Sequence, residues 1–200
     1  MSVIAGLLLA SGASRRFGSN KVVASLDGRA VVRWSAEALA GAVDATFVVV
    51  PVQADEIRGA LHGLPVRWIE NADAPEGMAS SIRAGVAALP VEAEAVVITL
   101  GDQPLIDGGV IRDVVATWRA APRATRAVVA EYADGRGHPV LFGASLFAEL
   151  RALDGDRGAR ELLRAHDESV AVVRVSGVRP ADVDTPDALT ALARGDRPAR

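Results

Sequence analysis

Short runs of apolar residues recur along the chain, and nearly every position within them is aliphatic or β-branched. A strand with one face in water alternates apolar and polar residues, whereas a strand covered on both faces reads as a continuous apolar run. The pattern therefore predicts a buried, mostly parallel sheet. The predicted strands comprise residues 3–9, 46–52, 66–70, 95–100, 127–132, 140–142 and 170–175.

Segments with helical periodicity separate these strands. In residues 31–42, apolar side chains recur three or four positions apart, among them Val31, Trp34 and Leu39. Thr185 can cap a last helix, because Pro186 suits the first turn that follows it. Further helices are predicted for residues 54–61, 78–89, 109–120, 145–153 and 159–165.

The alternation of strands and helices indicates an α/β fold, with right-handed crossovers and a single doubly wound, Rossmann-like sheet. Neither an internal repeat nor a long linker interrupts the pattern, and 200 residues suit one such domain. We expect one domain over residues 1–193 and a disordered tail over residues 194–200. Ligands of these sheets bind beyond the carboxyl ends of the strands, so the residues after each strand are the functional candidates.

The composition narrows the classes of function. Half of the residues are hydrophobic, as in globular chains, and the formal net charge is -3. Basic residues form no long run, so the sequence lacks the concentrated positive charge that non-specific nucleic-acid binding needs. The chain contains no cysteine, which excludes disulfides, thiolate metal sites and cysteine nucleophiles.

The opening apolar run, residues 3–10, is too short to cross a bilayer. A signal peptide carries its positive charge before the apolar run, whereas Arg15 and Arg16 follow this one. We interpret the run as a buried first strand. The expectation is a cytoplasmic protein without a membrane partner.

The loop after the first strand is the first candidate site. Small residues from Ala10 to Ser14 let the backbone approach a ligand, and exposed amides can point at phosphate oxygens. Arg16 and Lys21 add positive charge on either side of Gly18, as a triphosphate requires. The spacing fits neither the dinucleotide fingerprint nor the phosphate loop that ends in Gly-Lys-Ser/Thr. A surface turn with solvated cations is the alternative.

Two aspartates are candidate metal ligands. Asp102 follows the apolar run 95–100, and Asp184 precedes the residue that caps the last helix. Magnesium prefers one or two carboxylates together with phosphate oxygens and water. Taken alone, the segment of Asp102 fits a turn before proline slightly better than a metal site. The structural explanation is stronger still for Asp184, because aspartate and threonine are common before helices. On spacing alone, Asp182 is as good a ligand as Asp184.

A polar segment joins the third predicted strand to a helix. Ser80 or Ser81 near the helix start can donate a hydrogen bond to a ribose or base, and Gly77 permits close approach. A plain helix cap explains the serines about as well.

The three histidines have different surroundings. His138 lies just before the strand 140–142, where it can position a substrate or serve a structural role. A phosphate nucleophile is already ionised, so transfer to it requires no proton acceptor. His62 and His166 lie in polar helical contexts and are expected to be solvated.

Residues 8–18, Leu-Leu-Ala-Ser-Gly-Ala-Ser-Arg-Arg-Phe-Gly, followed by Lys21, resemble the opening signature of MobA-like NTP transferases. The Arg-Arg-Phe-Gly form most resembles molybdenum cofactor cytidylyltransferases, and Ser11 stands where the family usually carries alanine or glycine. Gly-Asp-Gln-Pro at 101–104 and Asp-Val-Asp-Thr-Pro at 182–186 resemble the family's two metal-binding segments. The resemblance extends to about residue 193 and implies a sheet of the nucleotide-diphospho-sugar transferase type.

The resemblance implies a role for each segment. It assigns Mg²⁺ to Asp102 and Asp184 and leaves Asp182 as a neighbour. It assigns catalysis to Lys21, Arg16 and Asp102. The implied nucleotide-binding residues are Leu9, Ala10, Ser11, Gly12, Arg16, Lys21, Asn71, Gly77 and Ser81. The implied acceptor-binding residues are Gln103, Pro104, His138, Asp156 and Gly158.

The implied reaction transfers CMP from CTP to the terminal phosphate of molybdopterin and releases pyrophosphate. A molybdoenzyme or its maturation chaperone would be the protein partner. GTP as donor, or another acceptor, is the nearest alternative. A nicotinamide-dependent oxidoreductase needs a different glycine spacing and an acid about 20 residues later, and Asp55 comes too late. A non-catalytic molybdopterin carrier would not explain two metal-type carboxylates.

Overall fold

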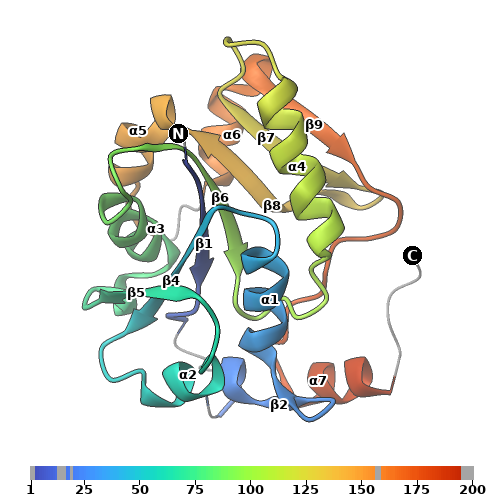
Figure 1. Ribbon diagram of the computed structural model, residues 1–200. Coiled ribbons are helices and arrows are strands. Elements are labelled where there is room, and N and C mark those ends of the chain that lie inside the picture. Colours follow the sequence, from blue (N-terminus) through green and yellow to red (C-terminus); the bar gives the residue numbers. More distant parts are fainter. Residues whose placement is uncertain (1–2, 13–16, 19, 156–158, 195–200) are drawn as a thin grey trace.

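The computed structural model describes residues 3–12, 17–18, 20–155 and 159–194. Its centre is a seven-stranded sheet in the order β5-β4-β1-β6-β8-β7-β9 (Figure 1). β8 runs antiparallel to its neighbours β6 and β7, and the other paired strands are parallel. The mostly parallel α/β sheet expected from the sequence is confirmed. The strands are β1 (Val3–Leu9), β4 (Ala45–Pro51), β5 (Val66–Asn71), β6 (Ala93–Leu100), β7 (Ala127–Tyr132), β8 (Gly135–Gly143) and β9 (Val170–Arg174).

Strand β8 differs from the expectation in length and direction. The apolar pattern predicts only residues 140–142, whereas the strand begins at Gly135. Gly135 has a φ of 117°, a backbone conformation that favours glycine, and it closes a tight hairpin between β7 and β8. The first half of β8 is partly exposed and carries glycine, arginine and histidine, so it lacks the apolar signal of its buried second half.

Helices cover both faces of the sheet, as Figure 1 shows. Side chains of α1, α2 and α4 form one core layer with the sheet, and those of α3, α5 and α6 form the other. Residues 145–153, predicted as one helix, begin with a 3-10 turn (Ala144–Leu146) before α5. The helices are α1 (Val31–Ala40), α2 (Asp55–Ala60), α3 (Met78–Ala87), α4 (Gly108–Ala120), α5 (Phe147–Arg151), α6 (Arg160–Ala165) and α7 (Pro186–Ala193).

Helices α1 and α3 approach β1 closely from opposite faces. A Cβ atom added to Gly6 of β1 would lie 2.8 Å from Leu39 of α1. A Cβ atom added to Gly85 of α3 would lie 2.5 Å from Leu7 of β1. The two glycines therefore allow the close packing that holds β1, and with it residues 10–12 directly after β1, in the middle of the molecule.

A small hairpin and the last helix form a separate apolar cluster below the sheet. The hairpin consists of β2 (Ser25–Leu26) and β3 (Arg29–Ala30), and the sequence pattern does not predict it. Leu26 packs with Val183 and with Leu192 of α7. The predicted cap of α7 is confirmed, because Thr185 accepts a hydrogen bond from the amide of Ala188 at 3.1 Å.

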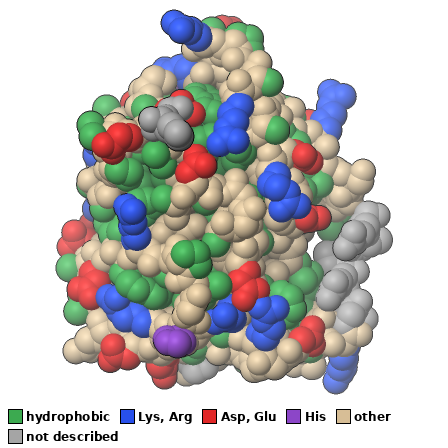
Figure 2. Space-filling model, in the orientation of Figure 1, with side chains coloured by type: hydrophobic (Ala, Val, Ile, Leu, Met, Phe, Trp, Pro, Cys, Tyr) green, Lys and Arg blue, Asp and Glu red, His purple; other side chains and the backbone are tan. Residues whose placement is uncertain are grey.

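The surface carries charges of both signs. On the face shown in Figure 2, acidic and basic side chains are interspersed over the elements. Within the described ranges, no helix has the length and apolar character needed to span a membrane. Residues 195–200 lie outside the described part of the chain, so the domain boundary at residue 193 stays a prediction.

Candidate active site

The carboxyl ends of β1, β4, β5 and β6 meet at one edge of the sheet, because these strands are parallel. The antiparallel strand β8 begins at the same edge, since Ile98 near the end of β6 pairs with Val140. A cleft of about 590 Å³ lies at this edge. Its lining comprises Leu9, Ala10, Ser11, Gly12, Lys21, Val22, Ala74, Pro75, Glu76, Gly77, Met78, Ser81, Leu100, Asp102, Gly155 and Asp184.

The cleft brings together nine of the residues expected at the site, namely Leu9, Ala10, Ser11, Gly12, Lys21, Gly77, Ser81, Asp102 and Asp184. Arg16, Asp156 and Gly158 lie outside the described residues. No sequence pattern singles out Glu76, Met78 or Gly155, which also line the cleft. Their positions follow from the packing of the turn before α3 and of the chain after α5.

Lys21 connects the two candidate metal ligands. Its ammonium nitrogen lies 2.6 Å from Oδ2 of Asp102 and 2.8 Å from Oδ1 of Asp184. Burial lowers the pKa of Lys21, but the hydrogen bonds and charges of the two aspartates outweigh it, so the pKa is raised above its usual value. The ammonium is therefore fully charged at neutral pH.

Backbone contacts hold both carboxylates in place. Gly101, between β6 and Asp102, donates to the carbonyl of Leu9 at 2.9 Å. The carbonyl of Asp102 accepts a hydrogen bond from the amide of Val183 at 2.8 Å. Asp184 is thereby tied to the end of β6 on one side and to the capped start of α7 on the other.

The donor set suits a magnesium ion that is shared with a ligand. Two carboxylate oxygens converge on one cation, the ammonium of Lys21, so they can also converge on a metal ion. Across the described residues, no cluster of three or more histidine, aspartate or glutamate side chains is placed to hold a metal. Magnesium typically takes one or two carboxylates and completes its shell with phosphate oxygens and water. A closed, purely protein-made site is not formed by the described residues.

Asp182, the alternative ligand on spacing, is engaged differently. Its Oδ1 accepts a hydrogen bond from Nε2 of Gln103 at 2.8 Å. Burial raises the pKa of Asp182, the hydrogen bond from Gln103 opposes that shift, and the charges of Asp102 and Asp184 add to it. Gln103 and Pro104 are themselves buried, so they support this side of the cleft from behind.

A buried polar network reaches the cleft through Ser11, Gly77 and Ser81. Asn71, at the end of β5, donates to the hydroxyls of Ser80 at 2.9 Å and Ser81 at 3.1 Å. Ser80 donates in turn to the carbonyl of Gly77 at 2.8 Å. The hydroxyls of Ser81 and Ser11 lie 2.6 Å apart. The network therefore joins the ends of β1 and β5 to the first turn of α3.

The network leaves one hydroxyl proton for a ligand. The hydroxyl of Ser81 already accepts from Asn71, and one proton lies between Ser81 and Ser11. Whichever serine donates that proton, the other keeps a hydroxyl proton that no described residue accepts. Because both serines line the cleft, this proton is available to an acceptor atom there, such as a carbonyl oxygen.

His138 lies beside the cleft without lining it. Its backbone carbonyl accepts a hydrogen bond from the hydroxyl of Tyr132 at 2.8 Å, and its peptide bond to Pro139 is cis. Although part of the residue is accessible, desolvation of the ring lowers the pKa of His138 to about 4. Asp102 raises this pKa and Arg160 lowers it further, by smaller amounts. The imidazole is neutral at neutral pH, which suits positioning rather than proton donation.

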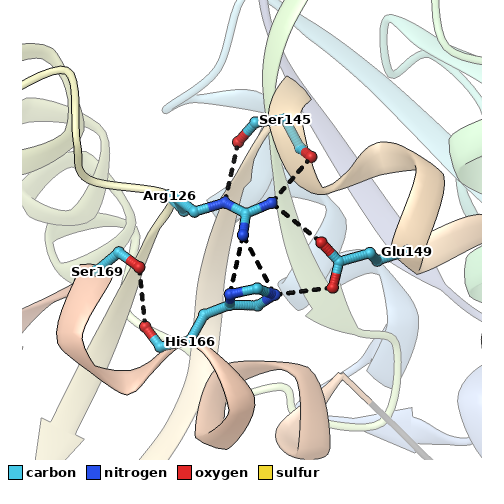
Figure 3. Close-up of polar contacts among 5 residues, drawn as sticks. All are labelled: Arg126, Ser145, Glu149, His166 and Ser169. Atoms are coloured by element: carbon cyan, nitrogen blue, oxygen red, sulfur yellow. Dashed lines mark hydrogen bonds and ion pairs between the residues drawn. The ribbon is translucent and has the colours of Figure 1, made fainter.

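The solvated setting expected for His166 is wrong. In Figure 3, Nε2 of His166 lies 2.7 Å from Oε2 of Glu149, and Nδ1 lies 2.9 Å from Nη1 of Arg126. Because arginine only donates hydrogen bonds, Nδ1 of His166 accepts from Arg126, and Nε2 is the ring nitrogen that faces Glu149. Arg126 also reaches the carbonyl of Ser145 at 3.2 Å. The cluster joins the start of β7 to α5 and α6 at the edge of the sheet opposite the cleft.

Known proteins resemble this chain over most of its length. The family model of the MobA-like NTP transferase domain matches residues 6–170 of the chain. The purine catabolism protein PucB of Bacillus subtilis (strain 168) is 31% identical over 194 residues, which cover 91% of this chain and 92% of PucB. A molybdenum cofactor guanylyltransferase of Cereibacter sphaeroides is 36% identical over 136 residues, which cover 67% of this chain and 65% of that protein.

Among solved structures, that of Rv0371c from Mycobacterium tuberculosis H37Rv resembles this fold with a TM-score of 0.85 and 29% identity. The match covers 96% of this chain and 98% of Rv0371c. A complex of Rv0371c with manganese has a TM-score of 0.79 at 28% identity and covers 96% of this chain and 99% of that one.

Proposed function

The chain belongs to the MobA-like NTP transferase family, and from this premise we propose that it transfers CMP from CTP to the terminal phosphate of molybdopterin. Membership of the family makes the chain a nucleotidyltransferase of the MobA-like type. The donor, the acceptor and the roles of individual residues are our proposal. The observation that carries it is the pair of aspartates at the cleft, held on one cation next to the loop after β1.

We assign the nucleotide to the side of the cleft formed by residues 9–12, called here the β1 loop, and by the hydrogen-bonded network of Ser11, Asn71, Ser80 and Ser81. Residues 9–12 present backbone and small side chains, which permit close approach to phosphates and ribose. The spare hydroxyl proton of Ser11 or Ser81 can bind an acceptor atom of the base or ribose. Lys21 contributes positive charge to the phosphates, and we assign the same role to Arg16 on the sequence alone.

The reaction itself needs charge stabilisation and alignment. An oxygen of the acceptor phosphate forms a bond to the α-phosphorus while the bond to the bridging oxygen of the β-phosphate breaks, and pyrophosphate leaves. No proton has to move, because the attacking oxygen is ionised. Lys21 stabilises the negative charge that spreads over the transferring oxygens. The rigid edge of the sheet supplies the alignment of the two substrates.

Asp102 and Asp184 would hold a divalent metal ion, for which we propose Mg²⁺. When bound, the ion neutralises phosphate charge and orients the triphosphate. The structure of the related Rv0371c in complex with manganese supports a divalent ion for a protein of this kind. Asp102 and Asp184 fit it because their oxygens converge on one cation.

The acceptor would approach from the side of β8. His138 is assigned to positioning, because its neutral ring can donate or accept one hydrogen bond. Gln103 and Pro104 shape the wall behind Asp182 on this side. Asp156 and Gly158 keep an acceptor role that rests on the sequence resemblance alone. A nucleotide triphosphate as substrate fits the cytoplasmic location expected from the sequence.

The donor is tested by measuring pyrophosphate and dinucleotide product with molybdenum-loaded molybdopterin, Mg²⁺ and either CTP or GTP. We expect turnover with CTP to exceed that with GTP by about tenfold or more, the scale set by one or two hydrogen bonds to the base. The Arg-Arg-Phe-Gly segment supports CTP, while the similarity to a guanylyltransferase makes GTP the main alternative. Equal turnover would overturn the donor and leave the reaction class intact.

The acceptor is tested in the same assay. Transfer to other phosphate-bearing metabolites but not to molybdopterin would overturn the acceptor, an outcome that the similarity to PucB makes worth including. Tight binding of molybdopterin without pyrophosphate release from any nucleotide would favour a carrier. Oxidation of NADH in a parallel assay would favour an oxidoreductase.

A further inference from the structure

Lys21 is the only lysine of the chain. The sequence contains 22 lysine and arginine residues, and every one of them except Lys21 is an arginine. A guanidinium is a planar fork with fixed donor directions, whereas an ammonium is a compact charge with rotatable donors on a flexible stem. The one side-chain ammonium of the sequence therefore lies at the position where two carboxylates meet.

The contacts of Lys21 place its ammonium where a metal ion would lie. One nitrogen contacts Oδ2 of Asp102 at 2.6 Å and Oδ1 of Asp184 at 2.8 Å. The Lys21 side chain is only 12% exposed, so it is enclosed by the cleft rather than lying on the surface. Lys21 begins a 3-10 turn (Lys21–Val23) whose Val22 is buried, which anchors its backbone beside the carboxylates.

Electrostatic repulsion prevents an ammonium and a divalent ion from binding the same two carboxylate oxygens. Magnesium binds carboxylate oxygens at about 2.0–2.1 Å, so it would lie within a few ångströms of a nitrogen that keeps its present contacts. Two positive charges at that distance repel strongly in a partly buried site. The metal can take the two carboxylate oxygens that Lys21 now contacts only if the ammonium of Lys21 moves away.

A triphosphate provides the ammonium with another partner. The β1 loop that would carry the phosphates lines the same cleft as Lys21, and the lysine stem is long and flexible. Moving the ammonium onto a phosphate oxygen replaces two carboxylate contacts with contacts to a more highly charged anion. The carboxylates are then left for the divalent ion that accompanies the nucleotide.

On the basis of the nucleotidyltransferase function proposed above, we propose that Lys21 is an internal cation that competes with the metal and is exchanged when nucleotide binds. The free protein thus keeps its two aspartates neutralised in part by Lys21 and binds a divalent ion weakly. Nucleotide and metal then bind cooperatively, because each favours the same rearrangement of Lys21. Lys21 acts in both states, first on the carboxylates and then on the phosphates.

The test measures the affinity of the protein for Mn²⁺ alone, for example by electron paramagnetic resonance of the free ion. Lys21→Met removes the competing charge at similar side-chain length, and we expect it to bind Mn²⁺ roughly tenfold more tightly or better. The matched control is Arg119→Met, which also removes one positive charge. Arg119 pairs with Asp44 at 3.5 Å, and Asp44 directly precedes β4 at the opposite edge of the sheet. The control should bind Mn²⁺ as the unmodified protein does.

An unchanged or weaker Mn²⁺ affinity in Lys21→Met would overturn the proposal and make Lys21 a fixed support of the two aspartates. A second measurement uses a non-hydrolysable CTP analogue. In the unmodified protein the analogue should raise Mn²⁺ affinity by a larger factor than in Lys21→Met, because only the former has a competitor to remove. Equal factors would contradict the exchange.

The single lysine allows the movement to be observed directly. Protein grown with ε-¹³C-lysine gives one lysine side-chain resonance in NMR spectra, that of Lys21. We expect this resonance to move when Mg²⁺ and the CTP analogue are added together and to remain near its starting position with Mg²⁺ alone. If neither protein binds Mn²⁺ even with nucleotide, the proposed function itself fails; if both bind it with nucleotide but Lys21→Met shows no gain alone, only the exchange fails.

Discussion

The charged side chains at the cleft depend on one another. Lys21 is shared by Asp102 and Asp184, and both aspartates also raise the pKa of the neighbouring Asp182. Removing any one of these charges therefore changes the electrostatic environment of the others. Individual substitutions need controls for folding as well as for activity.

Replacing Asp102 by asparagine tests its role in turnover. Asparagine at this position would keep the shape of the side chain but lose a charge that we assign to the metal, so Asp102→Asn should reduce turnover by about 100-fold or more. The matched control is Asp113→Asn, the same change at an exposed position on α4. Circular dichroism should show both variants folded. Activity retained in Asp102→Asn would exclude Asp102 as a metal ligand.

His138 predicts a pH dependence of stability. The pKa of His138 is about 4 in the folded protein and 6.5 in a free side chain. At pH values between these two, the unfolded chain therefore binds a proton on His138 and the folded chain does not. The free energy of unfolding should therefore fall as the pH drops from 6.5 to about 4.

His138→Gln cannot titrate and should lose roughly 1–3 kcal/mol of that pH dependence. Urea unfolding at about pH 7 and at about pH 4.5 spans most of the interval between the two pKa values. The change in the free energy of unfolding between these pH values is compared for the two proteins. The same pH dependence in the unmodified protein and in His138→Gln would mean that the His138 ring is not desolvated.

At the scale of elements, Gly85 of α3 and Gly59 of α2 allow the same substitution to be compared in a packed and in an open position. A methyl group at Gly85 of α3 would overlap Leu7, which is fully buried and cannot move without disturbing β1. Gly85→Ala should therefore destabilise the fold by about 1–3 kcal/mol despite the better helix propensity of alanine.

Gly59 of α2 has open space around the same added atom. Gly59→Ala should therefore leave stability unchanged or raise it by about 0.5–1 kcal/mol, because alanine favours the helix. Thermal unfolding of the two variants measures both effects. A Gly85→Ala protein as stable as Gly59→Ala would show that α3 does not pack on β1 as closely as described.

The elements also show where sequence reasoning succeeds and where it stops. Strands β1 and β7 match their predicted bounds, because both are largely buried and read as apolar runs, which only Glu131 interrupts near the end of β7. The hairpin of β2 and β3 has two residues in each strand, too few for any periodicity. The first half of β8 is held by its register with β7, which a local pattern does not contain.

The same limit applies to the candidate site. Asp102 and Asp184 become candidates through their positions after a strand and before a helix cap, which are local signals, and the family resemblance selects Asp184 over Asp182. The contact of Lys21 with both of them joins residues as far as 163 positions apart, so no local pattern encodes it. The hydrogen bonds of Asn71 to two serines likewise depend on how β5 meets α3.

For the whole molecule, the topology explains why one edge carries the site. Six strands of the sheet run in the same direction and end at this edge, and the antiparallel β8 begins there, so loops distant in the sequence converge on one cleft. The last helix completes it, because the cluster of Leu26, Val183 and Leu192 holds the segment with Asp184 against the rest of the fold. Loss of α7 should therefore disrupt the site even though α7 lies outside the sheet.

The central claim is that Asp102 and Asp184 share a divalent ion with a triphosphate bound along residues 9–12. Anomalous X-ray scattering from a crystal grown with Mn²⁺ and a non-hydrolysable CTP analogue tests it most directly. We predict an anomalous peak between the two carboxylates, with the phosphates beside the β1 loop and Lys21. A peak elsewhere, or nucleotide bound with both carboxylates turned away from it, would contradict the account.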